Sequence, residues 1–133
     1  MSESICSELW IGVIRKLYEK LSLTRGQITV AAELFAHELF FNQKANSISE
    51  AVSHALSVVK LKGDVEVAGN VYRVKIPGYE CPLKDLCPLP SFTAASARFL
   101  TGRRVYPATG ENFISFKDGF CVFELKDLGD VKA

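Results

Sequence analysis

The stretch CPLKDLCPLPSFTAASARFLTGRRVYPATGENFISFKDGFCVFE, residues 81–124, holds three of the four cysteines of the chain. Cys81 and Cys87 lie close together, whereas Cys121 is far from both in the sequence. An apolar segment that ends at Gly102 and two strand-like runs separate them. If this segment folds back on itself, one site can gather all three cysteines, so the fold of this region decides whether a site exists.

The apolar segment is predicted to be a helix that opens at Pro90 and ends at Gly102. A short strand at 103–106, a second at 113–116 and a last one at 120–125 follow. Asp118-Gly119 is a typical two-residue hairpin turn between the last two strands. The residues predicted to face inward are Phe92, Ala95, Ser96, Phe99 and Leu100 of the helix, and Cys121, Phe123 and Leu125 of the last strand.

Upstream of this region the apolar residues recur at helical spacing in three segments. The first two helices are expected at about 8–21 and 27–42. A third helix begins at Ser47, which forms a capping-box pattern with Glu50, and Gly63 is the expected stop. A hairpin of alternating residues, 65–67 and 71–76, then leads to the cysteine region.

These elements predict an α+β domain in which N-terminal helices pack on an antiparallel sheet, in the order α-α-α-β-β-α-β-β-β. At 133 residues the chain fits a single domain that spans residues 1–133. Its hydrophobic content of 48% is high enough that we expect either a tight core or an apolar surface covered by a ligand or a second subunit.

The composition of the chain indicates which compartment and which partners to expect. The net charge of +1 argues against a dedicated nucleic-acid binder, and apolar runs interrupted by charges argue against a membrane span. The polar N-terminus shows no signal-peptide pattern, so we expect a cytoplasmic protein. Cysteines in that compartment are first interpreted as thiols or metal ligands and only then as disulfides.

Metal ligation, a disulfide and plain burial are all open for the cysteines. The five residues between Cys81 and Cys87 exceed the two to four that are common in zinc sites, although a proline after each cysteine stiffens the loop. A fourth ligand could come from Glu80, Glu111, His54 or water. The alternatives are a disulfide between Cys81 and Cys87, or three small buried hydrophobic side chains.

The sequence contains no phosphate-binding glycine loop, no nucleophile elbow and no histidine pair for zinc. We therefore predict that the chain is not an enzyme. His37 and His54 lie on predicted helices without a catalytic partner at a suitable spacing. A winged-helix DNA-binding regulator is an alternative, because a hairpin that carries Arg73 and Lys75 follows two helices, but the presumed recognition helix lacks basic residues in its N-terminal half.

From about Val65 onward the chain resembles the 4-vinyl reductase domain family, which shares the TRAPP-subunit fold. The resemblance rests on Cys87 before the helix 92–100, on Gly102-Arg103 after it, and on the segment 119–124 around the last cysteine. Gly119 lies closer to Cys121 than the corresponding glycine of the family does.

The resemblance implies a dimeric small-molecule-binding or sensory domain that zinc stabilises. Zinc would be held by Cys87, Cys121 and Glu111, and Cys81 would replace a cysteine that the family has near 112–114 and this chain lacks. The ligand would be a small apolar molecule in a pocket between helices and sheet, and the candidate lining residues are Phe35, Leu39, Phe92 and Phe99. An adaptor that presents an apolar surface to a protein partner is the third hypothesis.

Overall fold

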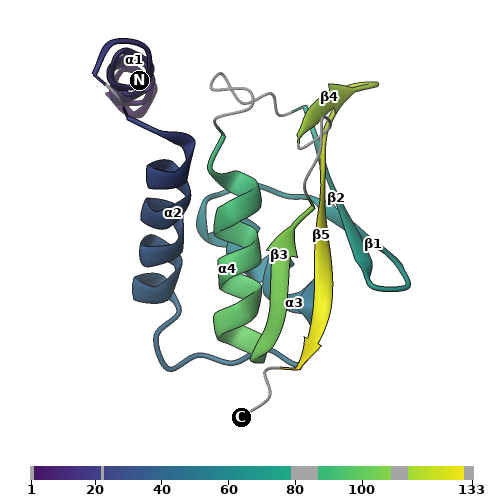
Figure 1. Ribbon diagram of the computed structural model, residues 1–133. Coiled ribbons are helices and arrows are strands. Elements are labelled where there is room, and N and C mark those ends of the chain that lie inside the picture. The colour runs from purple at the N-terminus through teal and green to yellow at the C-terminus, as the bar shows by residue number, and fades with distance from the viewer. Residues whose placement is uncertain (1, 22, 79–86, 109–113, 131–133) are drawn as a thin grey trace.

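The computed structural model describes residues 2–21, 23–78, 87–108 and 114–130. Its elements are α1 (Ser2–Lys20), α2 (Arg25–Leu39), α3 (Ile48–Val58), β1 (Asp64–Ala68), β2 (Val71–Pro77), α4 (Leu89–Thr101), β3 (Arg103–Pro107), β4 (Ser115–Lys117) and β5 (Phe120–Asp130). This order is the predicted one, and the α+β class is confirmed (Figure 1).

The sheet has five antiparallel strands in the order β1-β2-β5-β3, and β4 also pairs with β5. The last strand is long enough to pair with β2 along one edge and with both β3 and β4 along the other. Asp118 and Gly119 both have positive φ angles, as a two-residue hairpin turn prefers, so the predicted turn between β4 and β5 is confirmed.

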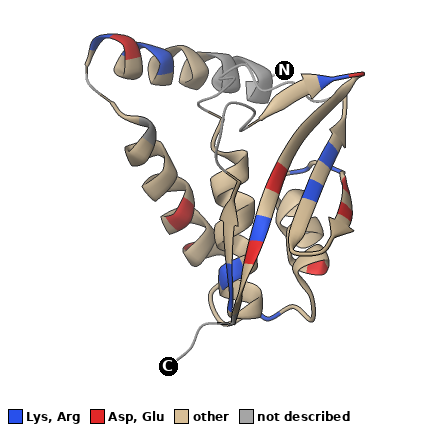
Figure 2. Ribbon diagram, turned by 45° about the vertical axis from the view of Figure 1, so that its right-hand side comes forward, with Lys and Arg blue, Asp and Glu red and all other residues tan. Residues whose placement is uncertain are grey.

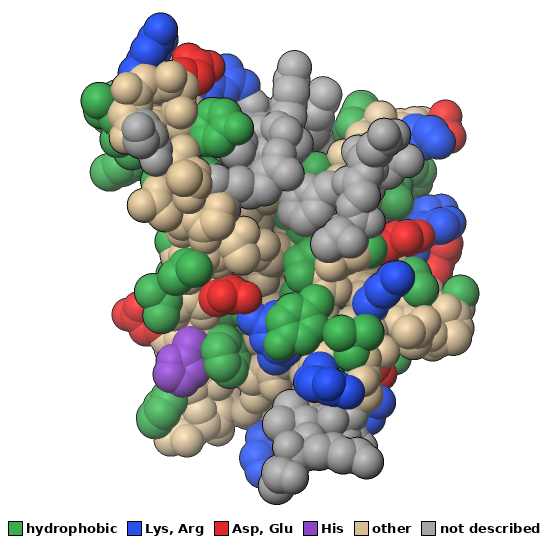
Figure 3. Space-filling view, viewed as in Figure 1, with side chains coloured by type: hydrophobic (Ala, Val, Ile, Leu, Met, Phe, Trp, Pro, Cys, Tyr) green, Lys and Arg blue, Asp and Glu red, His purple; other side chains and the backbone are tan. Residues whose placement is uncertain are grey.

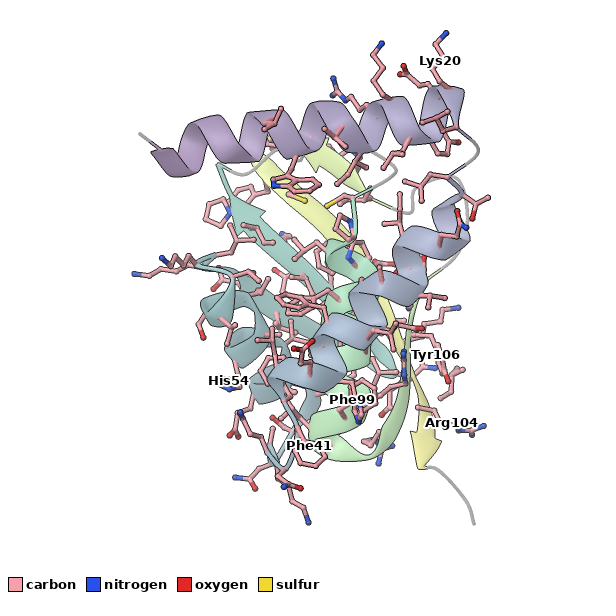
Figure 4. All side chains as sticks on the ribbon, turned by 90° about the vertical axis from the view of Figure 1, so that its left-hand side faces the viewer. Lys20, Phe41, His54, Phe99, Arg104 and Tyr106 are labelled. Carbon is pink, nitrogen blue, oxygen red and sulfur yellow. The ribbon has the colours of Figure 1, made fainter. Side chains whose placement is uncertain are left out.

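Helices α3 and α4 cover one face of the sheet, α2 packs on the outer side of α4, and α1 crosses the end of this stack (Figures 1 and 4). The fourth helix is therefore an interior element, buried from Leu89 to Ala97. Thr93 and Ser96 are fully buried, but their hydroxyls donate to the carbonyls of Leu89 and Phe92 in their own helix, at 2.9 and 2.7 Å. Because these hydroxyls are hydrogen-bonded, burying them costs the helix little free energy.

Two helix starts follow capping chemistry. Ser47 precedes α3 and accepts a hydrogen bond from the backbone N–H of Glu50, as predicted. Before α2, Thr24 and Gln27 form a complete capping box, which places the start of this helix at Arg25 rather than near Gln27. The first helix begins at Ser2, six residues earlier than the predicted Glu8.

The predicted stop of α3 at Gly63 is wrong, because the helix ends at Val58. Lys60 takes the left-handed conformation with a φ of 64°, although such a position favours glycine. The N–H of Leu61 then donates to the carbonyl of Leu56 at 2.8 Å, and the N–H of Lys60 donates to that of Ser57 at 3.0 Å. This pair of bonds is a Schellman motif, which satisfies the last carbonyls without a glycine.

Gly63 instead allows a close approach between the segment after α3 and β2. A Cβ at this position would lie 2.9 Å from the carbonyl oxygen of Lys75 and 3.0 Å from the Ile76 side chain. We expect Gly63→Ala to lower the free energy of unfolding by about 1–3 kcal/mol, because the backbone must shift to relieve the overlap. Urea unfolding of the variant and the wild type measures this loss of free energy. Gly26→Ala is the control, since its Cβ would only make an ordinary 3.7 Å contact, and an equal loss in both variants would contradict the prediction.

Candidate functional site

An apolar pocket of about 550 Å³ lies where α1, α2 and the start of α4 meet the segment after α3. Its lining consists of Ile14, Leu23, Gln27, Ile28, Ala31, Ala32, Phe35, Val59, Leu61, Cys87, Pro88, Leu89 and Phe92. All of these except Gln27 are apolar or weakly polar, and none carries a charge. The pocket therefore combines the size and the lining that are common in sites for small organic ligands.

Helix α2 forms one wall of the pocket through residues spaced by one or two turns. Ile28, Ala31 and Phe35 share a face of this helix, and the small side chain at Ala31 leaves space between the larger two. The opposite wall is the start of α4, where Pro88 lies at the N-cap and Cys87 is buried immediately before it. Pro90 lies in the first turn of α4, where its missing N–H leaves no backbone donor unsatisfied.

Two aromatic residues of the pocket lining belong to a cluster that extends into the core. The rings of Phe35 and Phe92 lie 5.8 Å apart between centroids, and those of Phe92 and Phe40 lie 6.3 Å apart. Such offset contacts stabilise the positions of the rings beyond the burial of their area. Phe92 is thus held from two sides, whereas Phe35 remains about half exposed and faces both the pocket and solvent.

The polar exception, Gln27, is occupied by the capping box. Its side-chain oxygen accepts a hydrogen bond from the backbone N–H of Thr24 at 2.8 Å, and the backbone N–H of Gln27 donates to the Thr24 hydroxyl at 3.1 Å. A carboxylate or phosphate group deep in this pocket would lose its water without gaining a charged partner. The described lining is therefore better suited to neutral, apolar atoms than to a charged group.

The four residues predicted to bind a ligand divide into two pairs. Phe35 and Phe92 line the pocket. Leu39 packs against the core, and Phe99 lies further along α4, where its ring contacts that of His37 at 4.8 Å. Figure 4 shows Phe99 low in the molecule, near Phe41 and away from the junction with α1. Both are outside the pocket, although their helical spacing is equally compatible with an inner position.

The predicted metal ligands are only partly within the described residues. Cys87 and Cys121 are both buried, and Cys121 lies on the inner face of β5, opposite Ile76 in the sheet. Cys81, Glu111 and Glu80 lie outside the part of the chain that the structure describes.

The fourth-ligand candidate His54 contacts Phe40 and Gln43. Its ring packs on Phe40 at 5.3 Å, and its Nε2 lies 3.1 Å from the side-chain oxygen of Gln43. Within residues 2–21, 23–78, 87–108 and 114–130, no three His, Cys, Asp or Glu side chains form a group that could hold a metal ion. A zinc site with Cys81 and Glu111 stays a prediction.

Sequence reasoning missed most of the pocket. Ile14, Leu61 and Ala31 line it, and they come from three different elements or segments. One signal was present: α2 carries apolar residues on nearly all sides, so a single core-facing stripe does not account for its sequence. The lining from α1 and from the segment after α3 follows only from the angle at which these elements meet.

The structure does not favour the winged-helix alternative. The hairpin β1–β2 that would form the wing is part of the five-stranded sheet. Its cations are paired on the outer face of that sheet, where Arg73 bonds the carboxylate of Glu124 at 2.9 Å and Lys75 lies 3.4 Å from that of Glu66. Red and blue residues accordingly lie side by side along these strands in Figure 2. The presumed recognition helix α3 contains neither lysine nor arginine.

Over the described residues, no helix combines the length and the hydropathy needed to cross a bilayer.

Comparisons with known proteins assign the chain to no family. No protein-family model, curated protein or solved structure matches the chain. The likeness to the 4-vinyl reductase family therefore stays a prediction from short motifs.

Proposed function

We propose that the chain is a ligand-binding domain for a small, neutral, apolar molecule, with a sensory or regulatory role. The observation that carries this proposal is the 550 Å³ pocket, whose described lining residues are uncharged and include one amide side chain, Gln27, whose oxygen accepts a hydrogen bond in the capping box. Ligand pockets are commonly about 300–1,000 Å³ and mostly apolar, and this pocket falls within both limits.

Binding is supported over catalysis by the composition of the lining. Among the described residues of the lining, Cys87 is the only one with a nucleophilic side chain, and none of them is a histidine or a carboxylate that could act as its base. An apolar guest would gain dispersion contacts with Phe35, Phe92 and the aliphatic walls and would displace poorly held water. The chemistry of the pocket is thus suited to holding a molecule rather than converting one.

Filling the pocket with a side chain tests the proposal. Ala31 lines the pocket but is exposed, so Ala31→Trp places an indole ring in the space with little disturbance of the core. We expect wild-type protein to bind the neutral dye N-phenyl-1-naphthylamine, and we expect the variant to bind it at least about 10-fold more weakly, which corresponds to about 1.4 kcal/mol. A fluorescence titration measures both dissociation constants.

Ala68→Trp is the matched control for this titration, because Ala68 is exposed at the end of β1 and does not line the pocket. It should bind the dye like the wild type. Equal loss in both tryptophan variants would show that the dye binds elsewhere. No binding by the wild type would refute a preformed apolar site.

Zinc is a separate proposal. Thiolates and a carboxylate are ligands that zinc accepts, so Cys81, Cys87, Cys121 and Glu111 would suit it chemically. We expect one zinc ion per wild-type chain by metal analysis and native mass spectrometry, and none for Cys87→Ser. Cys6→Ser changes a thiol outside the proposed set and should keep the metal. Metal-free wild-type protein purified with zinc present would eliminate the site and leave the pocket proposal intact.

A further inference from the structure

A second pocket, here named the outer pocket, lies on the face of the sheet opposite to the one that α3 and α4 cover. Its volume is about 530 Å³, which is within the range of sites for small molecules. Strands β2, β4 and β5 line it, and its described lining mixes cations and carboxylates with a serine and apolar residues. In Figure 3 basic and acidic side chains accordingly lie together along the right-hand edge of the molecule, over the strands. The outer pocket therefore suits a different ligand from the apolar pocket.

The register of the sheet places an apolar strip between polar side chains. Phe120 and Val122 alternate with buried residues of β5 and therefore point to the outer face. Lys75 of β2 and Ser115 of β4 flank Val122 from its two sides, and Lys117 of β4 pairs with Phe120. Neighbouring strands are about 4.8 Å apart, so the polar residues border a strip on the order of 10 Å wide. A flat ring can lie on such a strip with its substituents within reach of the polar groups.

The polar groups beside this strip are donors that the protein itself uses only in part. Among the described residues, the Ser115 hydroxyl and the Lys117 ammonium group have no hydrogen-bond or ion-pair partner. Nζ of Lys75 lies 6.0 Å from the centroid of the Phe120 ring and 3.4 Å from the carboxylate of Glu66. Strong charged hydrogen bonds are shorter, at about 2.7–2.9 Å, so this ion pair is loose. All three donors could therefore bond an anionic oxygen above the strip.

We propose that the outer pocket binds a flat aromatic molecule that carries a phosphate group, such as a mononucleotide. The ring would lie on Phe120 and Val122, because stacking on an aromatic side chain suits any flat ring. The phosphate oxygens would accept hydrogen bonds from Lys75, Ser115 and Lys117. A phosphate has three such oxygens and up to two negative charges, so it matches one hydroxyl and two ammonium groups better than a carboxylate does.

The carboxylates around the outer pocket limit the size of this ligand. Glu124 is neutralised by Arg73, whose Nε and Nη2 bond one of its oxygens at 3.0 and 2.9 Å. Asp118 at the turn and Glu66 beside Lys75 remain, and both would repel further phosphates. Since the affinity for a nucleic acid strand grows with the number of phosphates that are neutralised, this arrangement favours a molecule with a single phosphate group.

Phenyl phosphate tests the proposal, because it contains only the ring and the phosphate group. We expect a titration followed by two-dimensional NMR to shift the backbone amide signals of Lys75, Lys117 and Phe120. Adenosine monophosphate should shift the same signals. Inorganic phosphate lacks the ring and benzyl alcohol lacks the charge, so each should bind at least about 10-fold more weakly than phenyl phosphate.

Variants of the cations and of Glu66 separate a binding role from a structural one. Lys117→Ala should weaken the binding of phenyl phosphate about 10-fold, because a charged donor is lost. Lys126→Ala is the matched control, since Lys126 is exposed on the same face of β5 but does not line the outer pocket, and it should bind like the wild type. Glu66→Gln should instead tighten binding about 2- to 5-fold, because it frees Lys75 from its ion pair.

Three results would overturn the proposal. The first is wild-type protein whose signals do not shift at millimolar phenyl phosphate, or shift only around the apolar pocket. The second is an equal loss in Lys117→Ala and Lys126→Ala, which would show a general attraction to surface cations. The third is an oligonucleotide that binds more tightly than adenosine monophosphate, which would assign the face to a nucleic acid strand. None of these results depends on dye binding in the apolar pocket.

Discussion

Phe92→Ala is expected to lower the free energy of unfolding by about 3 kcal/mol, which is at the lower end of the range for deleting a buried phenylalanine. Phe92 is only 4% exposed, and its ring contacts those of Phe35 and Phe40 at 5.8 and 6.3 Å. The variant loses the transfer free energy of the ring and both aromatic contacts. Because one side of Phe92 already borders the pocket, the cost should not reach the upper end of the range.

Urea unfolding followed by far-UV circular dichroism measures this loss, and a fall of about 10 °C in the midpoint of thermal unfolding should accompany it. The same variant enlarges the pocket from within. We therefore expect it to retain binding of N-phenyl-1-naphthylamine at temperatures where it is folded, in contrast to Ala31→Trp.

Phe99→Ala is the matched control, since both residues are on α4 and seven positions apart, on the same side of the helix. Phe99 is 41% exposed, and its ring contacts that of the exposed residue His37. Removing the Phe99 ring should therefore lower the free energy of unfolding by no more than about 1 kcal/mol. If both alanine variants lost the same free energy of unfolding, the prediction that burial of the ring decides the loss would be wrong.

Arg98→Leu is expected to lower the free energy of unfolding by about 2–3 kcal/mol, because Arg98 joins three elements at once. Its Nη2 bonds the carboxylate of Glu33 on α2 at 2.6 Å, and its Nη1 donates to the carbonyl of Val105 on β3 at 2.8 Å. The guanidinium also lies over the ring of Tyr106, 4.6 Å from its centroid. Removing it leaves Glu33 and the Val105 carbonyl without this partner.

Burial sets the size of that effect. The Arg98 side chain is 17% exposed and that of Glu33 is 34% exposed, so water takes over only part of the lost interaction. The full penalty for an uncompensated buried charge, about 3–5 kcal/mol, is therefore not expected. Because α2 carries one wall of the pocket, we also expect Arg98→Leu to weaken dye binding even where the protein is folded.

Arg73→Leu makes the same chemical change in a pair that water reaches. Arg73 bonds Glu124 at 2.9 Å on the open face of the sheet, and about half of its side chain is exposed. Exposed pairs contribute about 0–1 kcal/mol, so this variant should unfold almost like the wild type. A double-mutant cycle of Arg98→Leu with Glu33→Gln isolates the pair, and an interaction energy near zero would contradict the bridging role.

Local chemistry explains why much of the fold could be predicted. Ser47 caps α3, Gly102 ends α4 with a φ of 76°, and Asp118-Gly119 turns β4 into β5, each through bonds within a few residues. Where a local rule failed, another local arrangement had satisfied the same backbone groups. Lys60 closed α3 in a Schellman motif, and Gly63 was needed for a close approach to β2.

The candidate site was less predictable because its parts are distant in the sequence. Phe35 and Phe92 line the pocket, as expected, but Cys87 was predicted only as a metal ligand. Ile14 and Leu61 join them only because α1 and the segment after α3 pack against α2 and the start of α4. Periodicity places a residue on a face of its own helix and does not say what that face meets.

The sequence by itself therefore determined the order of the elements, their class and most of their ends, because capping, turn chemistry and apolar periodicity act within a few residues. Only the tertiary structure decided that Phe92 is in the core while Phe99, on the same side of α4, is at the surface. It also decided which face of α2 is left uncovered. Those outcomes depend on the angles and positions at which distant elements pack, and packing follows the shapes of many side chains at once.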